Sequence, residues 1–581
     1  MSNSDTYDFM KSSVPQSVND YTPFTDKQWD FKQDQNQGIY STNSGMTQVT
    51  FDLNNMFDSS SFVDVSDMYL TIPIIVSACA GGSAVNGVQA APLAGYSLVS
   101  LKSGYQHLIH QMSITSNGKT VSDMQPFVNI IKHWKLISSM SATDIRSLGP
   151  SLGISEVLDN EKSVQWITAA ANTTKGIGLC NNQAFLSSAS SDVQLTQNSA
   201  QNSGTVNGAL QRRIARIPDI TANSTFNNLV GTVMNSAQIR TELKSYYTVF
   251  GNVMTWYDTA ILPLKYINDY INKCGIVRRA DLKLIFWVNT GSLQVPVNAP
   301  NSANTNYGAF TGSTFSNTCP FTVNLISGAS GGATGGFSAN TTYLAANLTI
   351  AKPITTSIGT ASINLGLGVD AHSMPACRIY YSKIKLDPVK ALTYVQENTA
   401  KEIVFENYYF NTFNNIPTGS NFSSLVQSGV KNPVALLVIP FISNTTTNVT
   451  WNQYASPFDT CPATFAPLSL TNLNVNLGNA NVLASSYNYT FENYLQQVIT
   501  AESLTSSDIG VNVGLLTQPF WESNRVYFID LARSRSADKD SLRSLSLNFT
   551  NNNIVAIDLM VFTIFLDKVT MNIETGIVLR D

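Results

Sequence analysis

A short stretch in the last quarter of the sequence changes its periodicity in a way that few folds accommodate. Between residues 472 and 477 (NLNVNL), leucine and valine alternate with asparagine, so one face of a strand can be buried while the other stays polar. A turn signal at 478–479 and a brief apolar run at 482–483 follow. In 487–498 (YNYTFENYLQQV) the apolar residues fall three and four positions apart, which is typical of one face of a helix. The stretch predicts a strand, a turn, a second strand and a helix.

Further strand patterns recur along most of the chain, with few helices between them. Segments rich in β-branched and aromatic residues and bounded by turn residues are expected to be strands. They are 48–53, 67–77, 107–116, 255–262, 280–288, 343–350, 376–386, 402–411, 434–443, 521–531, 545–549, 557–566 and 569–577. Helical spacing is confined to 127–136 (FVNIIKHWKL), 265–272 and the segment above. The pattern predicts an all-β chain with two units of about eight strands each, which fits double Greek-key jelly rolls.

Interruptions in the pattern divide the chain. Residues 1–45 are polar, with little periodicity, and are expected to form a flexible N-terminal arm. The first unit is expected at 46–388, with a long insertion near 140–240 where Ser, Asn, Gln and Gly dominate. Asp-Pro at 387–388 breaks the chain, so 389–400 is expected to be a linker and 401–581 the second unit.

Three blocks of the sequence resemble the major capsid proteins of polinton-like viruses, virophages and adintoviruses. The block 456–498, with SPFD, LTNLNVNLGNANVL and YTFENYLQQV, is similar to their second jelly roll. The block 262–290 (LPLKYINDYINKCGIVRRADLKLIFWVNT) is similar to part of their first jelly roll, and 521–576, which begins WESNRVYFIDLARSRSADKD, to their C-terminal strands. The resemblance implies two tandem eight-stranded jelly rolls, a double jelly roll, with short helices and long surface loops.

The same resemblance implies a function. It implies that three copies form a homotrimer, a pseudo-hexameric capsomer, and that capsomers build an icosahedral shell around double-stranded DNA. The insertion near 140–240 would then be an outward-facing tower. The implied partners are further copies of the chain, together with penton and minor capsid proteins. The implied location is the virion.

The chain has few charged residues, and its net charge does not favour binding to nucleic acid. Charged residues make up 12% of the chain and the net charge is -4, whereas a typical globular domain has about 25% charged residues. Residues 1–45 contain six aspartates and three lysines, so this segment lacks the basic character needed to neutralise a genome. We therefore expect no direct sequence-specific nucleic-acid binding and assign genome loading to other components.

The sequence carries no signal for export and no disulfide framework. The first ten residues (MSNSDTYDFM) lack a basic and an apolar region, so we expect synthesis in the host cell cytoplasm without a signal peptide. The six cysteines are scattered, without the spacing of a metal site, and are expected to be free thiols.

Residues suited to catalysis are few. His107 and His110 lie three apart on the expected strand 107–116, hence on opposite faces, which is poor geometry for a shared metal. His133 is expected to be a packing residue beside Trp134. No nucleophile-elbow, zincin or Walker sequence occurs. We expect no enzyme activity and no catalytic, cofactor-binding or metal-binding residues.

Arginines and lysines form a few local clusters. Arg278 and Arg279 precede the strand at 280–288 and are candidates for a subunit contact or a nucleic-acid patch, or else mark a solvated strand edge. Arg525, Arg533 and Arg543 lie in or near a charged loop. They are candidates for pairing with carboxylates of a neighbouring jelly roll, or else are satisfied within that loop.

One expected ion pair lies near the second resembling block. Asp269 falls four residues after Lys265 on the expected helix 265–272, so the two are expected to pair.

Two other functions fit an all-β chain of this kind. A carbohydrate-binding β-sandwich protein or glycosidase would require exposed aromatic platforms or two carboxylates facing a cleft. A minor capsid or spike protein would share the same chemistry and differ in copy number and symmetry. The oligomeric state separates the capsomer from the sandwich protein.

Overall fold

The computed structural model describes most of the two expected units. The described residues are 24–36, 40, 46–54, 61–82, 99–101, 104–123, 125–154, 247–250, 253–278, 281–290, 292–296, 314–315, 321–323, 341–350, 355–358, 361–364, 376–443, 468–478, 480–483, 488–501, 518, 521, 525–531, 541–553 and 556–580. Arg279, Arg533 and residues 155–240, which are most of the tower expected at 140–240, lie outside them.

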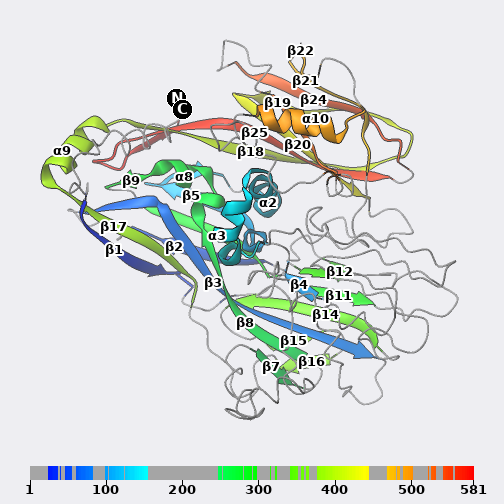
Figure 1. Ribbon diagram of the computed structural model, residues 1–581, viewed down its shortest axis with the longest axis horizontal. Coiled ribbons are helices and arrows are strands. Elements are labelled where there is room, and N and C mark those ends of the chain that lie inside the picture. Colours follow the sequence, from blue (N-terminus) through cyan, green and yellow to red (C-terminus); the bar gives the residue numbers. More distant parts are fainter. Residues whose placement is uncertain are drawn as a thin grey trace.

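The first lobe, residues 24–386, is built on two antiparallel sheets (Figure 1). One sheet contains β1 (Phe24–Gln33), β17 (Arg378–Leu386), β3 (Phe62–Gly82) and β8 (Val253–Pro263), paired in that order. The other contains β2 (Met46–Asp52), β10 (Leu282–Asn289), β5 (Ile109–Ser116) and β6 (Lys119–Ser122). Alternate residues of the second sheet point into the core, where the Phe51 and Phe286 rings meet edge to face at 6.0 Å.

The second lobe, residues 401–580, repeats this construction. One sheet contains β18 (Lys401–Ile416), β25 (Ile557–Met571), β20 (Pro433–Ile442) and β23 (Tyr527–Asp530), with β26 (Val578–Arg580) beside β25. The other contains β19 (Asn421–Val430), β24 (Arg543–Thr550), β21 (Thr471–Leu477) and β22 (Ala480–Asn481). The predicted alternation is confirmed, because Leu473, Val475 and Leu477 are buried while their asparagine neighbours reach the surface.

Both lobes arrange eight strands in the same order. When these strands are lettered B to I along the chain, β1, β2, β3, β5, β6, β8, β10 and β17 form the first set. The second set is β18, β19, β20, β21, β22, β23, β24 and β25. In each lobe the pairing is B-I-D-G in one sheet and C-H-E-F in the other, which is an antiparallel Greek-key arrangement.

The first lobe owes its greater length to two insertions. Between strands F and G lie α2 (Val128–Ser139), the helix predicted at 127–136, and α3 (Ala142–Leu152), which begins the expected tower. Between strands H and I lie β11 (Ser292–Pro296), β12 (Thr314–Phe315), β13 (Phe321–Val323), β14 (Thr341–Ile350), β15 (Thr355–Ile358) and β16 (Ala361–Asn364). Because β14 pairs with the far half of β3, this insertion lengthens the sheet. The sequence predicted an insertion only at 140–240.

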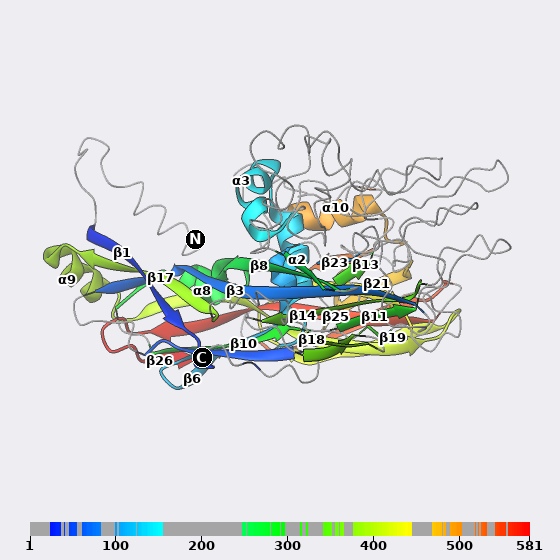
Figure 2. The same cartoon turned by 90° about the horizontal axis from the view of Figure 1, so that it is seen from below.

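Several short elements complete the fold. They are β4 (Val99–Leu101), η3 (Tyr105–Leu108), β7 (Tyr247–Phe250), η5 (Leu264–Tyr266), α8 (Asp269–Cys274), β9 (Ile276–Val277), α9 (Pro388–Glu397) and α10 (Phe491–Thr500). Figure 2 shows the strands of both lobes running along the molecule, with α3 and α10 on one side and β26 toward the other. None of the described helices is long and apolar enough to cross a bilayer.

The expected arm at 1–45 requires a correction, because residues 24–33 form β1, strand B of the first lobe. This strand pairs in register with β17 from Phe24↔Leu386 to Gln33↔Arg378. The Asp30 carboxylate also accepts a hydrogen bond from the Tyr381 hydroxyl at 3.1 Å and lies 3.0 Å from Lys383 Nζ. The charged residues made the segment resemble an arm, but they lie on an edge strand, where one side of the chain meets water.

The expected linker at 389–400 is largely helical. In α9 the Asp387 carboxylate accepts the Val389 N–H at 3.0 Å, and Pro388 occupies the first turn, where its missing N–H costs nothing. The Tyr394 hydroxyl donates to the Ile276 carbonyl at 2.8 Å. The connection between the lobes is therefore fastened to the first lobe.

Removing β1 should destabilise the first lobe. A chain starting at residue 34 loses the backbone pairing with β17, so its free energy of unfolding should fall by about 2 kcal/mol or more. Thermal unfolding followed by circular dichroism measures the change. A chain starting at residue 23 retains β1 and is the matched control. Equal stability of the two truncated chains would contradict the assignment of β1 to the sandwich.

Candidate functional site: the interface between the lobes

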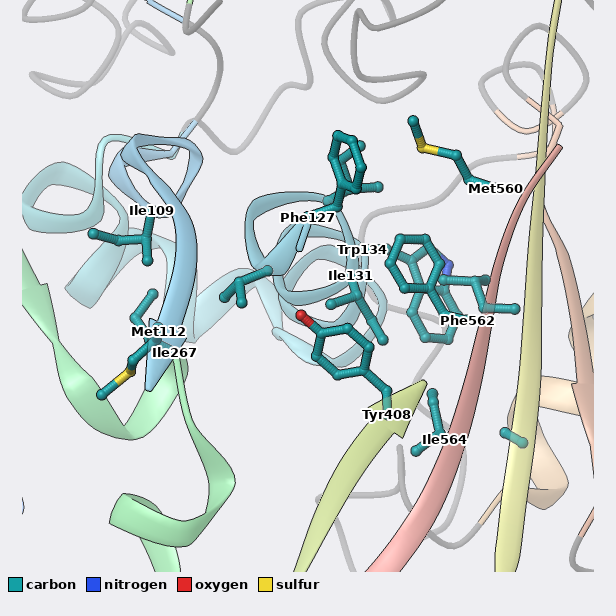
Figure 3. Close-up of a cluster of buried hydrophobic side chains, with 14 of the residues drawn as sticks. Ile109, Met112, Phe127, Ile131, Trp134, Ile267, Tyr408, Met560, Phe562 and Ile564 are labelled. Atoms are coloured by element: carbon teal, nitrogen blue, oxygen red, sulfur yellow. The ribbon is translucent and has the colours of Figure 1, made fainter. Parts of the chain in front are cut away.

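Helix α2 lies between the two lobes and packs on both. Its segment VNIIKHWKLISS places apolar residues three and four apart, and Trp134 is fully buried. Figure 3 shows Ile131 and Trp134 directed toward Tyr408 of β18 and toward Phe562 and Ile564 of β25. The helix of one lobe thus covers the outer face of the B-I-D-G sheet of the other.

Aromatic rings form much of this contact. The Phe127 ring lies 4.9 Å from that of Phe410, and the Trp134 ring lies 5.1 Å from that of Phe528. Ring pairs at such distances contribute about 0.5 to 1.5 kcal/mol each beyond the area they bury. The Trp134 indole also donates to the Tyr494 hydroxyl of α10 at 3.2 Å. These contacts fix the distance between the two lobes along α2.

A charged cluster lies beside the aromatic contact. Lys135 Nζ of α2 lies 2.5 Å from Glu406 Oε2 of β18. The Asp269 carboxylate of α8 accepts the backbone N–H of Glu406 at 2.9 Å and lies 3.6 Å from Lys273 Nζ. Both lobes therefore contribute to one hydrogen-bonded cluster, which specifies their alignment.

Burial and charge act in opposite directions on the groups of this cluster. Burial disfavours the ionised form of Asp269, but the attraction of Lys135, Lys273 and Lys132 outweighs it and lowers the pKa of the carboxyl. Burial likewise disfavours protonated Lys135, yet Glu406 and Asp269 raise its pKa. Burial, assisted by the nearby Lys135 charge, lowers the pKa of Lys132 to about 8. Asp269 and Lys135 are thus held in their charged forms at neutral pH.

Two further contacts join the lobes away from α2. Lys401 Nζ, at the start of β18, donates to the Cys274 carbonyl at the end of α8 at 2.5 Å. Arg580 of β26 lies 3.5 Å from the Asp123 carboxylate of the first lobe and 2.8 Å from Asp567 of the second. Hydrophobic side chains of the two lobes also belong to one continuous cluster. The lobes are therefore held together at well-separated points, so they form one rigid two-lobed unit.

The three described histidines, His107, His110 and His133, lie close to this interface, and one of them is not in the element predicted from the sequence. His107 belongs to η3 and not to the strand expected at 107–116, and its ring centroid lies 4.4 Å from that of His133. Gln106 Nε2 lies 2.5 Å from His133 Nδ1. His110 is on β5, edge to face with Phe127 at 4.8 Å. Within the described residues, no three His, Cys, Asp or Glu side chains are grouped as metal ligands.

The candidate arginines lie in different parts of the molecule. Arg278 is in the first lobe, with its guanidinium carbon 5.9 Å from the Phe62 ring centroid. Arg525 Nη1 lies 3.2 Å from Ser469 Oγ, and the guanidinium lies over Trp521 at 5.3 Å. Arg543 begins β24, opposite Val430 of β19. The pairing of Arg525, Arg533 and Arg543 with a neighbouring copy, and the subunit contact of Arg278 and Arg279, stay predictions.

Sequence reasoning missed the residues that join the lobes. It identified the helix at 127–136 from its spacing, but the partners of Trp134 and Lys135 are 360 and 271 residues away. It also expected Asp269 to pair with Lys265, whereas Asp269 pairs with Lys273 and the Lys265 ammonium lies over the Tyr266 ring at 5.3 Å. The available signal was two lysines three apart, Lys132 and Lys135, on a helix whose other residues include no aspartate, glutamate or arginine.

Loss of the Glu406 charge should weaken the chain markedly. Glu406→Gln leaves Lys135 and Lys132 near a less negative, largely buried cluster, and it should lower the free energy of unfolding by about 3 kcal/mol. Glu402→Gln on the same strand is the matched control, because the Glu402–Lys568 pair is exposed and should be worth under about 1 kcal/mol. Urea unfolding of both variants measures the difference. Equal losses would contradict the role given to Glu406.

Acid should weaken the contact around His110. Burial lowers the pKa of His110 to about 4, whereas the unfolded chain titrates near 6.5. Between these values the unfolded state binds the extra proton, so stability falls as pH drops from about 6.5 to 4. His110 should account for a loss of about 2 to 3 kcal/mol between pH 7.5 and 4.5. His110→Gln removes this contribution, so a variant with the same pH dependence as the wild type would contradict the assignment.

The fold is similar to that of solved viral proteins. No family model matches the sequence, and no curated protein matches it. A cryo-EM structure of the Sputnik virophage matches with a TM-score of 0.50 and 12% identity, over 96% of this chain and 89% of that one. The mavirus major capsid protein matches with a TM-score of 0.43 and 11% identity, over 95% and 90% of the two chains. The Faustovirus major capsid protein matches with a TM-score of 0.43 and 9% identity, over 97% of this chain and 93% of that one. With the strand order of its two lobes, the Sputnik match shows that this chain has the predicted double jelly-roll fold.

Proposed function

We propose that this chain is a major capsid protein, three copies of which form a pseudo-hexameric capsomer. The observation that carries the proposal is the rigid junction of two lobes with the same strand order. Two similar lobes held side by side give each copy a two-lobed outline. Three copies around a three-fold axis then present six similar lobes, and a unit with six similar sides can tile a hexagonal lattice.

The composition suits such a shell. The outward side chains of β19, β24 and β21 include Ser423, Asn548 and Asn474, which lie across from one another in register. Neutral polar faces of this kind carry little like-charge repulsion when copies pack closely. The capsomers would build an icosahedral shell around double-stranded DNA, with penton and minor capsid proteins as further partners and the virion as the location. The proposed role is structural and includes no catalytic step.

The names of similar proteins agree with this role. The mavirus and Faustovirus structures are described as those of major capsid proteins. The proposal for this chain rests on its own two-lobed geometry, with those names in support. A carbohydrate-binding sandwich protein would have no need for a second lobe fixed by a buried charged cluster.

The oligomeric state tests the proposal directly. Size-exclusion chromatography with light scattering should give a stable particle of three times 63.2 kDa. Negative-stain images of the same fraction should show a three-fold particle with six lobes. A chain that stays monomeric over a hundredfold range of concentration would overturn the capsomer, and a monomer that binds oligosaccharide would favour the sandwich protein.

A further inference from the structure

The two lobes differ in how the outer face of the same sheet is covered. In the second lobe, the outer face of B-I-D-G carries Tyr408 and Phe410 on strand B, Phe562 on strand I and Phe528 on strand G, and α2 packs on it. Phe528 and Phe562 are fully buried as a result. In the first lobe, the same face also carries aromatic side chains, but two of them are exposed to water.

These side chains form a continuous group on three neighbouring strands, which we name the aromatic patch: Trp29 and Phe31 of β1, Tyr380 of β17 and Tyr69 of β3. Tyr69 and Tyr380 stack at 4.9 Å with an interplanar angle of 5°. Trp29 lies 5.7 Å from Tyr69, and Phe31 lies 5.6 Å from Tyr380. Trp29 is 52% exposed and Phe31 46%. Adjacent exposed aromatic residues of this kind mark an interaction surface.

Cations border the aromatic patch. The Arg378 guanidinium lies 4.6 Å from the Phe31 ring centroid, and Lys27 Nζ lies 5.6 Å from that of Trp29. Trp, Tyr and Arg are the residues most often found at the centre of protein–protein interfaces. The cations also hold the rings in place, because each lies over a ring it can attract. The rings of the patch are thus positioned by contacts within one copy.

The position of the aromatic patch excludes the chain's own second lobe as its cover. In Figure 1, β1 and β17 lie on the side of the first lobe that is remote from the second lobe. Among the described residues, none of the second lobe covers this side, so it is open to a second molecule. The contact within one copy indicates which surface fits the outer face of a B-I-D-G sheet. There, this face of the second lobe is buried against the side of the first lobe that carries α2, the helix between strands F and G.

Charge distinguishes the two F–G helices. Helix α2 carries Lys132 and Lys135, and it packs on a sheet face that carries Glu406. The corresponding helix of the second lobe, α10, has Glu492 as its one charged residue. The aromatic patch bears Arg378 at its border, whereas Lys27 there pairs with Asp67 at 2.7 Å, so Arg378 supplies the positive charge. The negative charge on the α10 side of the second lobe is thus opposite in sign to the positive charge at the border of the patch. In the same way, the lysines of α2 are opposite in sign to Glu406 on the sheet face that α2 covers.

We propose that the aromatic patch binds the α10 side of the second lobe of another copy. This inference rests on the proposed function and names the surface that joins its subunits. The contact is heterologous, because patch and α10 side are different surfaces, so successive copies join head to tail and can close into a ring of three. Each contact between copies then repeats the arrangement that joins the two lobes within a copy.

The double variant Trp29→Glu/Phe31→Glu tests the inference. Both side chains are about half exposed, so the variant should still fold, with a melting temperature lowered by the loss of two ring pairs. Two carboxylates in a desolvated aromatic contact should weaken association at least a hundredfold, which light scattering and sedimentation would record as a monomer. Ile577→Glu/Leu579→Glu is the matched control, since these residues are 57% and 55% exposed and lie at the C-terminal end of the second lobe. The control should assemble as the wild type does.

The outcomes separate this inference from the proposed function. A wild-type trimer with a monomeric, folded patch variant and a trimeric control supports the inference. A patch variant that still forms the trimer overturns it and leaves the capsomer standing, whereas a monomeric wild type overturns both. If the variant fails to fold, hydroxyl-radical footprinting of the wild type decides. Trp29 should then be oxidised at least fivefold more slowly in the trimer than in diluted monomer, and an unchanged rate would mean that another copy does not cover the patch.

Discussion

The architecture depends on the burial of one sheet face, the outer face of β18-β25-β20-β23. In a free-standing antiparallel sandwich, such a face meets water and its strands alternate apolar with polar residues. Strand β20 does not alternate, because its residues from Val434 to Phe441 are all buried. The second lobe therefore requires a cover for its stability, and α2 of the first lobe supplies it. The angle between the lobes follows from this requirement.

The charged cluster contributes orientation more than stability. Moving Lys135 and Glu406 out of water is costly, and their mutual attraction does little more than offset that cost. An apolar contact by itself would allow the lobes to slide or rotate, since hydrophobic burial has no direction. The 2.9 Å bond from the Glu406 N–H to Asp269 ties the cluster to the backbone of β18. Rotation of one lobe against the other would break this bond and leave charged groups without partners in the buried interface.

The predictions from sequence succeeded where a pattern is local. The alternation at 472–477 and the helical spacings at 127–136 and 487–498 correspond to β21, α2 and α10, and the resembling blocks indicated the double jelly roll. The predictions failed where partners far away in sequence decide the outcome. Strand β1 resembles a polar arm until β17, about 350 residues later, pairs with it. The sequence gives little indication of the lobe interface, because neither Trp134 nor Lys135 has a neighbour in sequence that identifies its partner.

The duplicated strand order gives a physical reason for a two-lobed chain. If both F–G helices carried the same charge, each lobe would accept either lobe as its neighbour, and chains could join in several registers. The lysines of α2 and the glutamate of α10 make the two surfaces unlike. Like charges placed across a dry contact are strongly disfavoured. Under the proposed contact, a first lobe would accept a second lobe beside it and disfavour another first lobe. Charge would then specify the alternation of lobes around the ring, and the aromatic faces would supply the affinity.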